Sequence, residues 1–408
     1  MRGIPASFLI YFFAFVFLIE LISYFGVRKL IQLLQIKKRR YIAFPYILFS
    51  VSITGLLIYS FSNTELIRQS RSYTFFFIVI SLTILNLLPK SFFAIMTLLS
   101  TIFRSIGRKQ YQVIMLAGSF LISFALILSI SYGIFIGRFN IRIEKQNLYL
   151  SNLPKQFDGF KIVLISDLHL GSFGKNTKVL AQAVQIIEKL QPDLLLFTGD
   201  IVNNFSDEYK GFTPYLKQLS GRYGKFAIQG NHDYGDYFNW PDTLSKRENL
   251  NEIKAGLVNA GFTLLQNQSA KISAKDTSIS LIGVENWGHP PFPQYANLEV
   301  AMKGIPENSF KILMSHDPAH WEAKVVHQTN ISLTLSGHTH GGQFGMKIAG
   351  IEFSPIYLYQ KNWGGLYQSG NQFLYVNRGL GTVGFPGRVE MSPEITLLTL
   401  FRTPDPHY

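Results

Sequence analysis

The first third of the chain consists of four long apolar runs that are separated by short polar segments. A helix needs about 20 apolar residues to cross the hydrocarbon core of a bilayer, and each run is long enough. The pattern therefore predicts an all-α transmembrane domain of about four helices over residues 1–139. The predicted helices cover residues 6–27, 43–62, 74–103 and 115–136.

The third run is interrupted near its centre by Pro89 and Lys90. A single tilted, kinked helix is the first interpretation, because neighbouring helices can satisfy the backbone groups that a proline frees. A re-entrant hairpin that does not cross is the alternative. The two interpretations differ by one crossing, so they put everything after the fourth run on opposite sides of the membrane.

Beyond residue 139 the pattern changes to short apolar runs, each of which ends in polar residues or glycine. Runs of about five residues with such ends are typical of buried strands, and helical periodicity fills residues 179–190 and 250–260. This alternation predicts an α/β domain over residues 140–408. Its predicted strands are Lys161–Ile165, Leu194–Thr198, Phe226–Gln229, Ile279–Val284, Lys311–Met314, Ile331–Leu335, Phe373–Val376 and Ile395–Leu400.

The charge divides the chain at the same place. The formal net charge is +13: residues 1–140 hold 14 Lys or Arg and two acids, which is +12, and the remainder holds 24 against 23, which is +1. A nucleic-acid-binding domain needs a basic surface, so the near-neutral C-terminal domain argues against a membrane-tethered nuclease, and we expect no nucleic-acid partner. The basic excess lies beside the apolar runs, where it orients spans and meets membrane lipids.

The basic residues of the loops predict an orientation in the cell membrane. Cationic loops stay in the cytoplasm, so the loop between the first two runs should lie inside, and four crossings then put residues 140–408 outside. A hairpin at Pro89 would reverse this orientation. The cluster Lys37–Arg40 has an alternative role as a site for anionic lipid headgroups. The basic residues of this loop are Arg28, Lys29, Lys37, Lys38, Arg39 and Arg40.

Five polar clusters each come directly after the end of a predicted strand. In α/β proteins the carboxyl ends of the strands form the edge where sites lie, so we expect these clusters to meet. They offer carboxylate, amide and imidazole ligands, which suit divalent metals, and the chain has no cysteine that could supply sulfur. The clusters are Asp167-Leu168-His169, Gly199-Asp200, Gly230-Asn231-His232-Asp233, His316 and Gly337-His338-Thr339-His340.

This order of motifs resembles the calcineurin-like metallophosphoesterase superfamily, whose pattern is D-x-H, G-D, G-N-H-[DE], a lone His and G-H-x-H. The pattern is complete from Asp167 to His340. The segments 165–171, 337–343 and 377–381 resemble a branch that groups bacterial phosphoesterases similar to YkuE with eukaryotic transmembrane metallophosphoesterase proteins. The resemblance covers about residues 145–402 and implies a four-layer α/β/β/α sandwich.

The resemblance also implies a centre of two divalent metal ions, for which Mn, Fe and Zn are the candidates. Such a pair can activate water and clamp a phosphoryl group, so the reaction needs no serine or cysteine nucleophile. One ion would be held by Asp167, His169 and His340, the other by Asn231, His316 and His338, with Asp200 bridging both.

Two further pairs of residues are expected near the reaction. By the same resemblance His232 would act as the acid for the leaving oxygen, and Asp233 is placed to orient it through a hydrogen bond. Arg378 and Arg388 follow the last strands and could grip a substrate phosphate, or form a structural salt bridge, for example with Glu394; both readings stay open. The histidines that match no motif, His289, His320, His327 and His407, are expected at the surface.

The sequence thus predicts a membrane-anchored, metal-dependent hydrolase of a phosphoester or phosphoanhydride. The anchor indicates a phosphorylated substrate at the membrane, such as a lipid or glycolipid precursor. Some relatives in the resembling branch act as UDP-diacylglucosamine pyrophosphatases of lipid A synthesis, which would require a cytoplasmic domain. A non-catalytic membrane sensor is the other alternative, although Asp200 and His232, whose loss would mark it, are both present.

Overall fold

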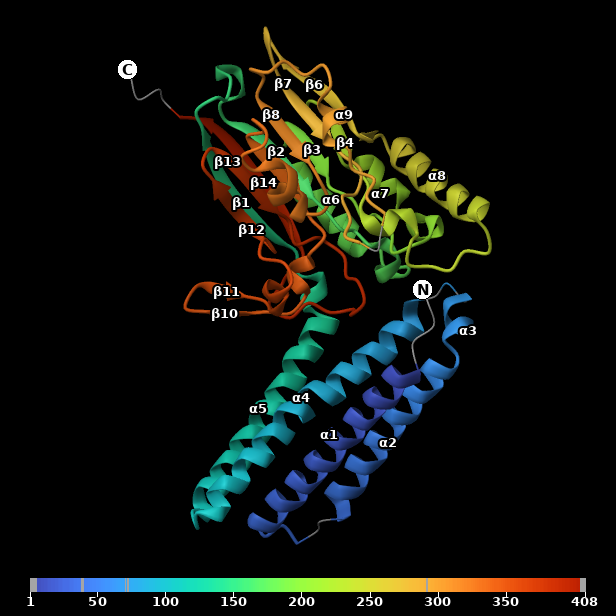
Figure 1. Ribbon diagram of the computed structural model, residues 1–408, viewed down its shortest axis with the longest axis vertical. Helices are drawn as coiled ribbons and strands as arrows, with labels where there is room; N and C mark the ends of the chain where they lie inside the picture. The colour runs from blue at the N-terminus through green and yellow to red at the C-terminus, as the bar shows by residue number, and fades with distance from the viewer. Residues whose placement is uncertain (1–5, 38–39, 70, 72, 291–292, 404–408) are drawn as a thin grey trace. The chain divides into compact units, whose positions relative to one another are not determined.

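The computed structural model describes residues 6–37, 40–69, 71, 73–290 and 293–403. The chain divides into two compact units, Met1–Phe135 and Ile136–Tyr408, which we call the helical unit and the sheet unit (Figure 1). The basic residues Lys38 and Arg39 of the first loop lie outside the described residues, as does His407.

The described part of the helical unit contains four helices that are long and apolar enough to cross a membrane. Much of their large apolar surface is uncovered: Phe44 is 68 % exposed and Leu121 is 66 % exposed. Surface of this kind suits lipid, because in water it would be an aggregation-prone patch. The helices are α1 (Ala6–Leu33), α2 (Arg40–Ser62), α4 (Tyr73–Ser105) and α5 (Lys109–Phe135), with the short α3 (Thr64–Gln69) after α2.

Helix α4 continues through Pro89, so the predicted single helix is correct and the hairpin alternative is wrong. Neighbouring helices bond the backbone around the proline: the hydroxyl of Ser123 donates to the carbonyl of Pro89 at 3.0 Å, and that of Ser23 donates to the carbonyl of Lys90 at 3.0 Å. Side chains from α5 and α1 therefore bind the backbone of α4 directly at the proline and at the residue after it.

A cluster of polar side chains, which we call the polar centre, lies near the middle of these helices and consists of Glu20, Ser50, Asn86 and Lys90. Glu20 accepts a hydrogen bond from Asn86 at 2.6 Å and one from the ammonium of Lys90 at 2.8 Å. Lys90 also donates to the hydroxyl of Ser50 at 2.7 Å and lies 4.3 Å from the ring centroid of Tyr46. The mid-span lysine is thus paired inside the helical unit, which offsets the cost of a charge in lipid.

The sheet unit is built on two six-stranded sheets. The first has the order β1 (Arg142–Leu150), β14 (Glu394–Arg402), β2 (Phe160–Ile165), β3 (Leu194–Phe197), β4 (Lys225–Ala227) and β5 (Thr263–Leu264). The second has the order β12 (Gly365–Ser369), β13 (Gln372–Val376), β9 (Leu333–Ser336), β8 (Lys311–Met314), β7 (Thr277–Gly283) and β6 (Gln268–Ala274).

The two sheets pack face to face, and helices cover both outer faces (Figure 1). Leu164 of β2 and Leu335 of β9 share the core between the sheets. Neighbouring residues of a strand point to opposite faces of the sheet, so Val163, which precedes Leu164, packs with Ile187 of a covering helix. This arrangement confirms the predicted four-layer α/β/β/α sandwich. The helices are α6 (Lys178–Leu190), α7 (Thr213–Gln218) and α8 (Thr243–Asn259) on the first sheet and α9 (Leu298–Met302) on the second.

All eight strands predicted from apolar runs are present, displaced by at most two residues at either end. The strands that the apolar pattern missed are β1, β5, β6 and β12, which are the four sheet edges, and a separate hairpin of β10 (Met346–Ile348) and β11 (Ile351–Phe353). An edge strand buries less of its surface and carries polar residues, so it shows no continuous apolar run.

Candidate metal centre

The fold brings the predicted metal ligands to one edge of the two sheets. Strands β2, β3 and β4 are parallel neighbours, and so are β7, β8 and β9, so their carboxyl ends lie together. Asp167 and His169 follow β2, and Asp200 follows β3. The residues that follow β4, β8 and β9 complete the group: they are Asn231, His316, His338 and His340.

Five of these residues have a backbone conformation that side chains usually avoid. A positive φ is uncommon outside glycine and costs on the order of 1 kcal/mol or more. Such conformations persist where the surrounding structure holds them, and they cluster at functional sites. The φ angles are 50° at Asp167, 41° at His169, 59° at Asp200, 73° at His338 and 53° at His340.

Two glycines of the motifs leave room for carboxylates. A Cβ atom on Gly230 would overlap the carboxylate of Asp200, and one on Gly337 would overlap Asp167 and the hydroxyl of Ser166. The glycines in G-N-H and G-H-x-H are therefore required by the close approach of ligand side chains.

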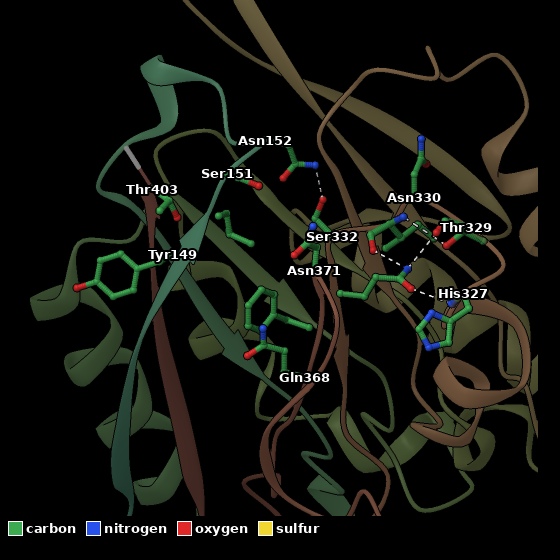
Figure 2. A pocket seen from close by; sticks show the side chains of 14 residues that line it. Tyr149, Ser151, Asn152, His327, Thr329, Asn330, Ser332, Gln368, Asn371 and Thr403 are labelled. Atoms are coloured by element: carbon green, nitrogen blue, oxygen red, sulfur yellow. Dashed lines mark hydrogen bonds between the residues drawn. The ribbon is translucent and has the colours of Figure 1, made fainter. Parts of the chain in front are cut away.

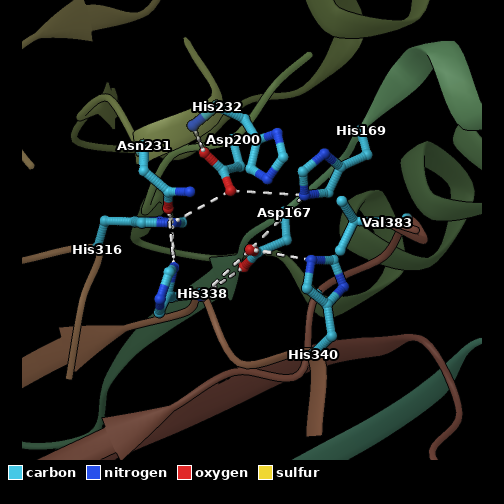
Figure 3. A network of polar contacts seen from close by, with 12 residues as sticks. Asp167, His169, Asp200, Asn231, His232, His316, His338, His340 and Val383 are labelled. Carbon is cyan, nitrogen blue, oxygen red and sulfur yellow. Dashed lines mark hydrogen bonds and ion pairs between the residues drawn. The ribbon is translucent and has the colours of Figure 1, made fainter. Parts of the chain in front are cut away.

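The ligand atoms form groups that share members (Figure 3). One group contains Asp167, His169 and His340, and another contains Asp200, His316 and His338. A group of His169, Asp200 and His232 links the two, and within each group the atoms lie within 4.8 Å of one another. The Nε2 atom of His340 is 3.4 Å from Oδ1 of Asp167. The carboxylate of Asp200 lies between the groups, because its Oδ2 is 3.5 Å from His169 and 3.2 Å from His316.

Asn231 belongs to the second group. Its amide oxygen is 3.0 Å from Nε2 of His316 and 2.8 Å from Nδ1 of His338. Its amide nitrogen donates to the hydroxyl of Tyr237 at 2.7 Å, which fixes the oxygen toward the two imidazoles. Sequence reasoning missed Tyr237; an aromatic residue shortly after a ligand motif was the available signal.

The arrangement fits divalent cations. Both ring nitrogens of His169 and Nε2 of His340 are buried and lack a hydrogen-bond partner in the described structure. An unsatisfied buried polar atom costs about 1–3 kcal/mol, and coordination to a cation would satisfy it. The donors are oxygen and nitrogen atoms, as borderline divalent metals prefer.

When no metal ion is considered, Asp200 and His316 form an ion pair that shifts the pKa of both side chains. Burial would lower the pKa of His316, but the charge of Asp200 reverses this and raises the pKa to about 10. Burial would raise the pKa of Asp200, but the charge of His316 outweighs it and holds that pKa well below its usual value. The Asp200 carboxylate thus attracts positive charge strongly, which a divalent cation would supply in place of the proton.

His232 lies beside the first group and is held by the backbone. Its Nδ1 is 2.7 Å from the carbonyl oxygen of Asn203, its ring stacks on Tyr237 with centroids 4.4 Å apart, and it meets His169 edge-on at 4.8 Å. Burial lowers the pKa of His232 to about 4. Because a carbonyl can only accept, Nδ1 carries the hydrogen, and Nε2 is left to exchange a proton.

The structure corrects the role predicted for Asp233. Instead of bonding His232, its carboxylate accepts hydrogen bonds at 2.9 Å from the backbone amides of Gly230, Asp200 and Ile201. The carboxylate joins the loop after β4 to the loop after β3, so Asp233 positions the ligand loops, and the carbonyl of Asn203 orients His232.

Arg378 and Arg388 are both buried and already bonded. Arg378 pairs with Glu352, and also lies 3.6 Å from Glu394 and 3.8 Å from Glu144, so the salt-bridge reading holds for it. Arg388 is 1 % exposed and donates to main-chain carbonyls, including that of Gly381 at 3.0 Å.

One Arg388 nitrogen lies 3.2 Å from Nδ1 of His340. Both arginines are therefore occupied by protein partners in this structure, which does not match the alternative in which they bind a substrate phosphate. Arg388 instead supports the loop that carries a ligand.

The histidines outside the motifs divide into two kinds. His289 and His327 are exposed, as expected, and His289 pairs with Asp317 at 3.0 Å. His320 is 1 % exposed, which contradicts its predicted surface position. It stacks on Trp287 with ring centroids 4.6 Å apart and its Nδ1 is 2.9 Å from the hydroxyl of Ser315, so it is a packed core residue.

A polar pocket of about 590 Å³ lies away from this edge, at the C-terminal end of β1 and the N-terminal ends of β9 and β13 (Figure 2). Its amides are largely bonded within the protein: Gln372 donates to the carbonyl of Ile331 at 3.0 Å, and Asn152 donates to the hydroxyl of Ser332 at 2.8 Å. The described residues that line this pocket include no carboxylate, and the hydrogen bonds among them account for its polar side chains.

Comparisons with known proteins agree with this geometry. A family model described as calcineurin-like phosphoesterase matches residues 160–342. The metallophosphoesterase YkuE of Bacillus subtilis is 34 % identical over 271 residues, which are 64 % of this chain and 86 % of that protein.

Two further relatives contain more than the sheet unit. A transmembrane protein with metallophosphoesterase domain from Bos taurus is 31 % identical, over 62 % of this chain and 55 % of that protein. A metallophosphoesterase of Helicobacter pylori is 27 % identical over 395 residues, which are 95 % of this chain and 97 % of that protein. The chain therefore belongs to the calcineurin-like metallophosphoesterase family, as a hydrolase of phosphoester bonds, and its described residues include four apolar helices of membrane-spanning length.

Proposed function

We propose that the protein is a membrane enzyme that hydrolyses a phosphoester or phosphoanhydride of a lipid or glycolipid precursor with two divalent ions. The observation that carries this proposal is the convergence of the seven predicted ligands at one edge of the two sheets. Among the described residues, buried imidazole nitrogens of this cluster have no hydrogen-bond partner. A non-catalytic sensor would not need both a complete ligand set and an oriented His232.

We assign the ligands as the sequence resemblance implies. Asp167, His169 and His340 would hold one ion, Asn231, His316 and His338 would hold the other, and Asp200 would serve both. When bound, two such ions act as Lewis acids that polarise the phosphoryl group and lower the pKa of water.

The protein's own contribution to bond cleavage is a positioned proton. The hydrogen bond from Nδ1 of His232 to the carbonyl of Asn203 fixes the ring so that Nε2 is free to take up a proton and pass it to the leaving oxygen. Tyr237 stacks on this ring and also binds Asn231, so the same side chain aligns the acid and a ligand. The backbone bonds of Asp233 keep the loops of Asp200 and Asn231 together while the substrate turns over.

The apolar helices are the feature that supports a lipid substrate. Helix α5 ends at Phe135 and the first strand begins at Arg142, so the start of the sheet unit is connected to an apolar helix by a segment of about 25 Å at most. If the basic first loop stays in the cytoplasm, as its charge favours, four crossings would put the sheet unit outside the cytoplasm, and an exported lipid phosphate would then be the substrate. A cytoplasmic unit would instead favour a nucleotide-linked lipid, as in a UDP-diacylglucosamine pyrophosphatase.

Substrate panels with the full-length protein in nanodiscs test the proposal. We expect Mn²⁺-dependent release of phosphate or a phosphorylated headgroup from lipid substrates, and cleavage of a soluble aryl phosphodiester or monoester. Asp200→Asn is the inactive control. Tight metal binding without hydrolysis of any substrate, in protein that is folded and metal-loaded, would favour the sensor.

A reporter fused after Tyr408 tests the side of the membrane. We expect the fusion to alkaline phosphatase to be active and a separate fusion to green fluorescent protein not to fluoresce, as for a C-terminus outside the cytoplasm. The opposite pattern would put the catalytic unit in the cytoplasm and would select the nucleotide-linked lipid as substrate.

A further inference from the structure

The hairpin of β10 and β11 has two chemically different faces. Met346 pairs with Phe353, Lys347 with Glu352, and Ile348 with Ile351. Paired residues share a face and neighbours along a strand alternate, so one face carries four apolar side chains and the other carries a lysine and a glutamate. The turn residues Ala349 and Gly350 have φ of 49° and 86°, as a tight two-residue hairpin turn requires.

The apolar face and the residues after it are uncovered. Among the described residues of the sheet unit, seven of the fourteen large exposed hydrophobic side chains fall within residues 346–359. Ile351 is 74 % exposed, and Leu358 and Tyr359, which follow β11, are 79 % and 89 % exposed. Concentrated apolar surface of this kind marks an interaction site. The seven are Met346, Ile348, Ile351, Phe353, Tyr357, Leu358 and Tyr359.

The polar face of the hairpin is turned toward the body of the sheet unit. Glu352 pairs with the buried Arg378, lies 3.3 Å from Arg142 of β1, and lies 3.5 Å from Lys347. These contacts fix the polar face inward and leave the apolar face outward. They also neutralise the only acid of the hairpin, so covering the hairpin with lipid would bury no unpaired carboxylate.

Covalent connection decides what can reach this face. Arg142, which contacts Glu352, is the seventh residue after Phe135, where the last apolar helix ends. Seven residues span about 25 Å at most, so the base of the hairpin stays close to the point where the chain leaves the bilayer. Tyrosine side chains such as Tyr357 and Tyr359 suit the headgroup region, where a ring has apolar and polar surroundings.

We propose that residues 346–359 insert their apolar face into the headgroup–acyl boundary of the bilayer that holds the protein's own helices. This membrane contact goes beyond the proposed hydrolysis and does not depend on it. The hydroxyl oxygen of Ser354, directly after β11, lies 2.7 Å from the carbonyl oxygens of both Gly341 and Phe344, to which it can donate its one hydrogen. The inserted hairpin is thereby fixed to the loop that carries His340, so it sets the depth of the metal centre relative to the lipid surface.

The absence of native cysteine allows a direct test with single labels. An environment-sensitive fluorophore is attached at Ile351→Cys in the full chain, in nanodiscs with and without lipids that carry a spin-label quencher near the headgroup. The control is Val258→Cys on α8, which is 56 % exposed and lies outside the hairpin. We expect at least about twofold stronger lipid quenching at position 351. Equal quenching at the two positions overturns the proposal.

A second pair of variants separates insertion from accidental proximity. With the label kept at position 351, Ile348→Ser combined with Leu358→Ser should reduce lipid quenching toward the control level. The matched control, Leu244→Ser, changes a residue that is 51 % exposed elsewhere and should leave quenching unchanged. If the hairpin were instead covered by a second copy of the chain, quenching at 351 would be low and would rise on dilution to one copy per nanodisc. That result would contradict the proposal.

Discussion

The polar centre of the helical unit and the metal-ligand cluster of the sheet unit are both buried groups of ionisable residues, but they are completed differently. In the polar centre, both oxygens of Glu20 accept hydrogen bonds, and Lys90 supplies the opposite charge. In the ligand cluster, the carboxylates lie among imidazoles, and nitrogens of His169 and His340 have no hydrogen-bond partner among the described residues. In the first group the charge of the acid is paired with a lysine, whereas the second offers buried imidazole nitrogens that a cation would coordinate.

This difference separates a structural role from a catalytic one. A buried ion pair that satisfies itself can be replaced as a pair by apolar residues with little loss of stability. A ligand set cannot be replaced in this way, because its members are placed for a third partner. The backbone agrees: five ligand residues hold positive φ angles, while Glu20 and Lys90 lie in regular helix.

The largest effect should come from Asp200, whose carboxylate lies between the two ligand groups. Asp200→Asn replaces a charged oxygen that approaches His169 and His316 with a neutral amide, so both ions should be lost or weakened. Hydrolysis should fall by on the order of 10³-fold or more, as for removal of a central catalytic group. Elemental analysis and turnover of an aryl phosphate measure both outcomes, and retention of two ions per chain would contradict the bridging role.

His232→Ala should lower turnover by about 10²–10⁴-fold and leave the metal content unchanged, because this ring supplies a proton rather than a ligand. His327→Ala, at an exposed histidine, is the matched control and should have no effect on turnover. Metal loss in His232→Ala as severe as in Asp200→Asn would assign His232 to the ligands instead.

Lys90→Met should destabilise the helical unit by about 3–5 kcal/mol, because it leaves Glu20 buried without its cation. The double variant Glu20→Leu with Lys90→Met should recover most of this loss. Thermal unfolding in nanodiscs measures both, with Ser60→Ala in α2 as a control. No recovery in the double variant would mean that the polar centre has a role that charge balance does not explain.

The smallest effect is expected at Arg378. Arg378→Lys keeps the positive charge toward Glu352 and Glu394, so KM for a soluble aryl phosphate should change by less than about threefold. A side chain that grips phosphate with two parallel hydrogen bonds would lose more on this change, since lysine cannot reproduce the geometry. A rise in KM of about tenfold or more, with stability unchanged, would return Arg378 to the substrate site.

What the sequence could predict depended on whether a residue's partners are near it in the chain. The ligands were found because each follows an apolar strand within a short motif, and strand ends meet in space. The partner of Lys90 was invisible because Glu20 lies 70 positions earlier in the sequence. The role of Asp233 was missed because its partners are backbone amides, which every residue type supplies and no sequence pattern marks. The burial of His320 was missed because its packing partner, Trp287, lies in a separate loop.

The order in which the strands are made has a consequence for how the protein matures. Strand β14 lies between β1 and β2, and pairs with β1 along all nine residues from Arg142 to Leu150. A ribosome synthesises β1 first and β14 after every other strand of that sheet. The strand that emerges from the membrane therefore has no neighbour until translation reaches Glu394, and β2 exposes its apolar edge for the same time. The first sheet of the sheet unit can therefore be completed only after the whole of that unit has been synthesised, when the helices of the helical unit are already made.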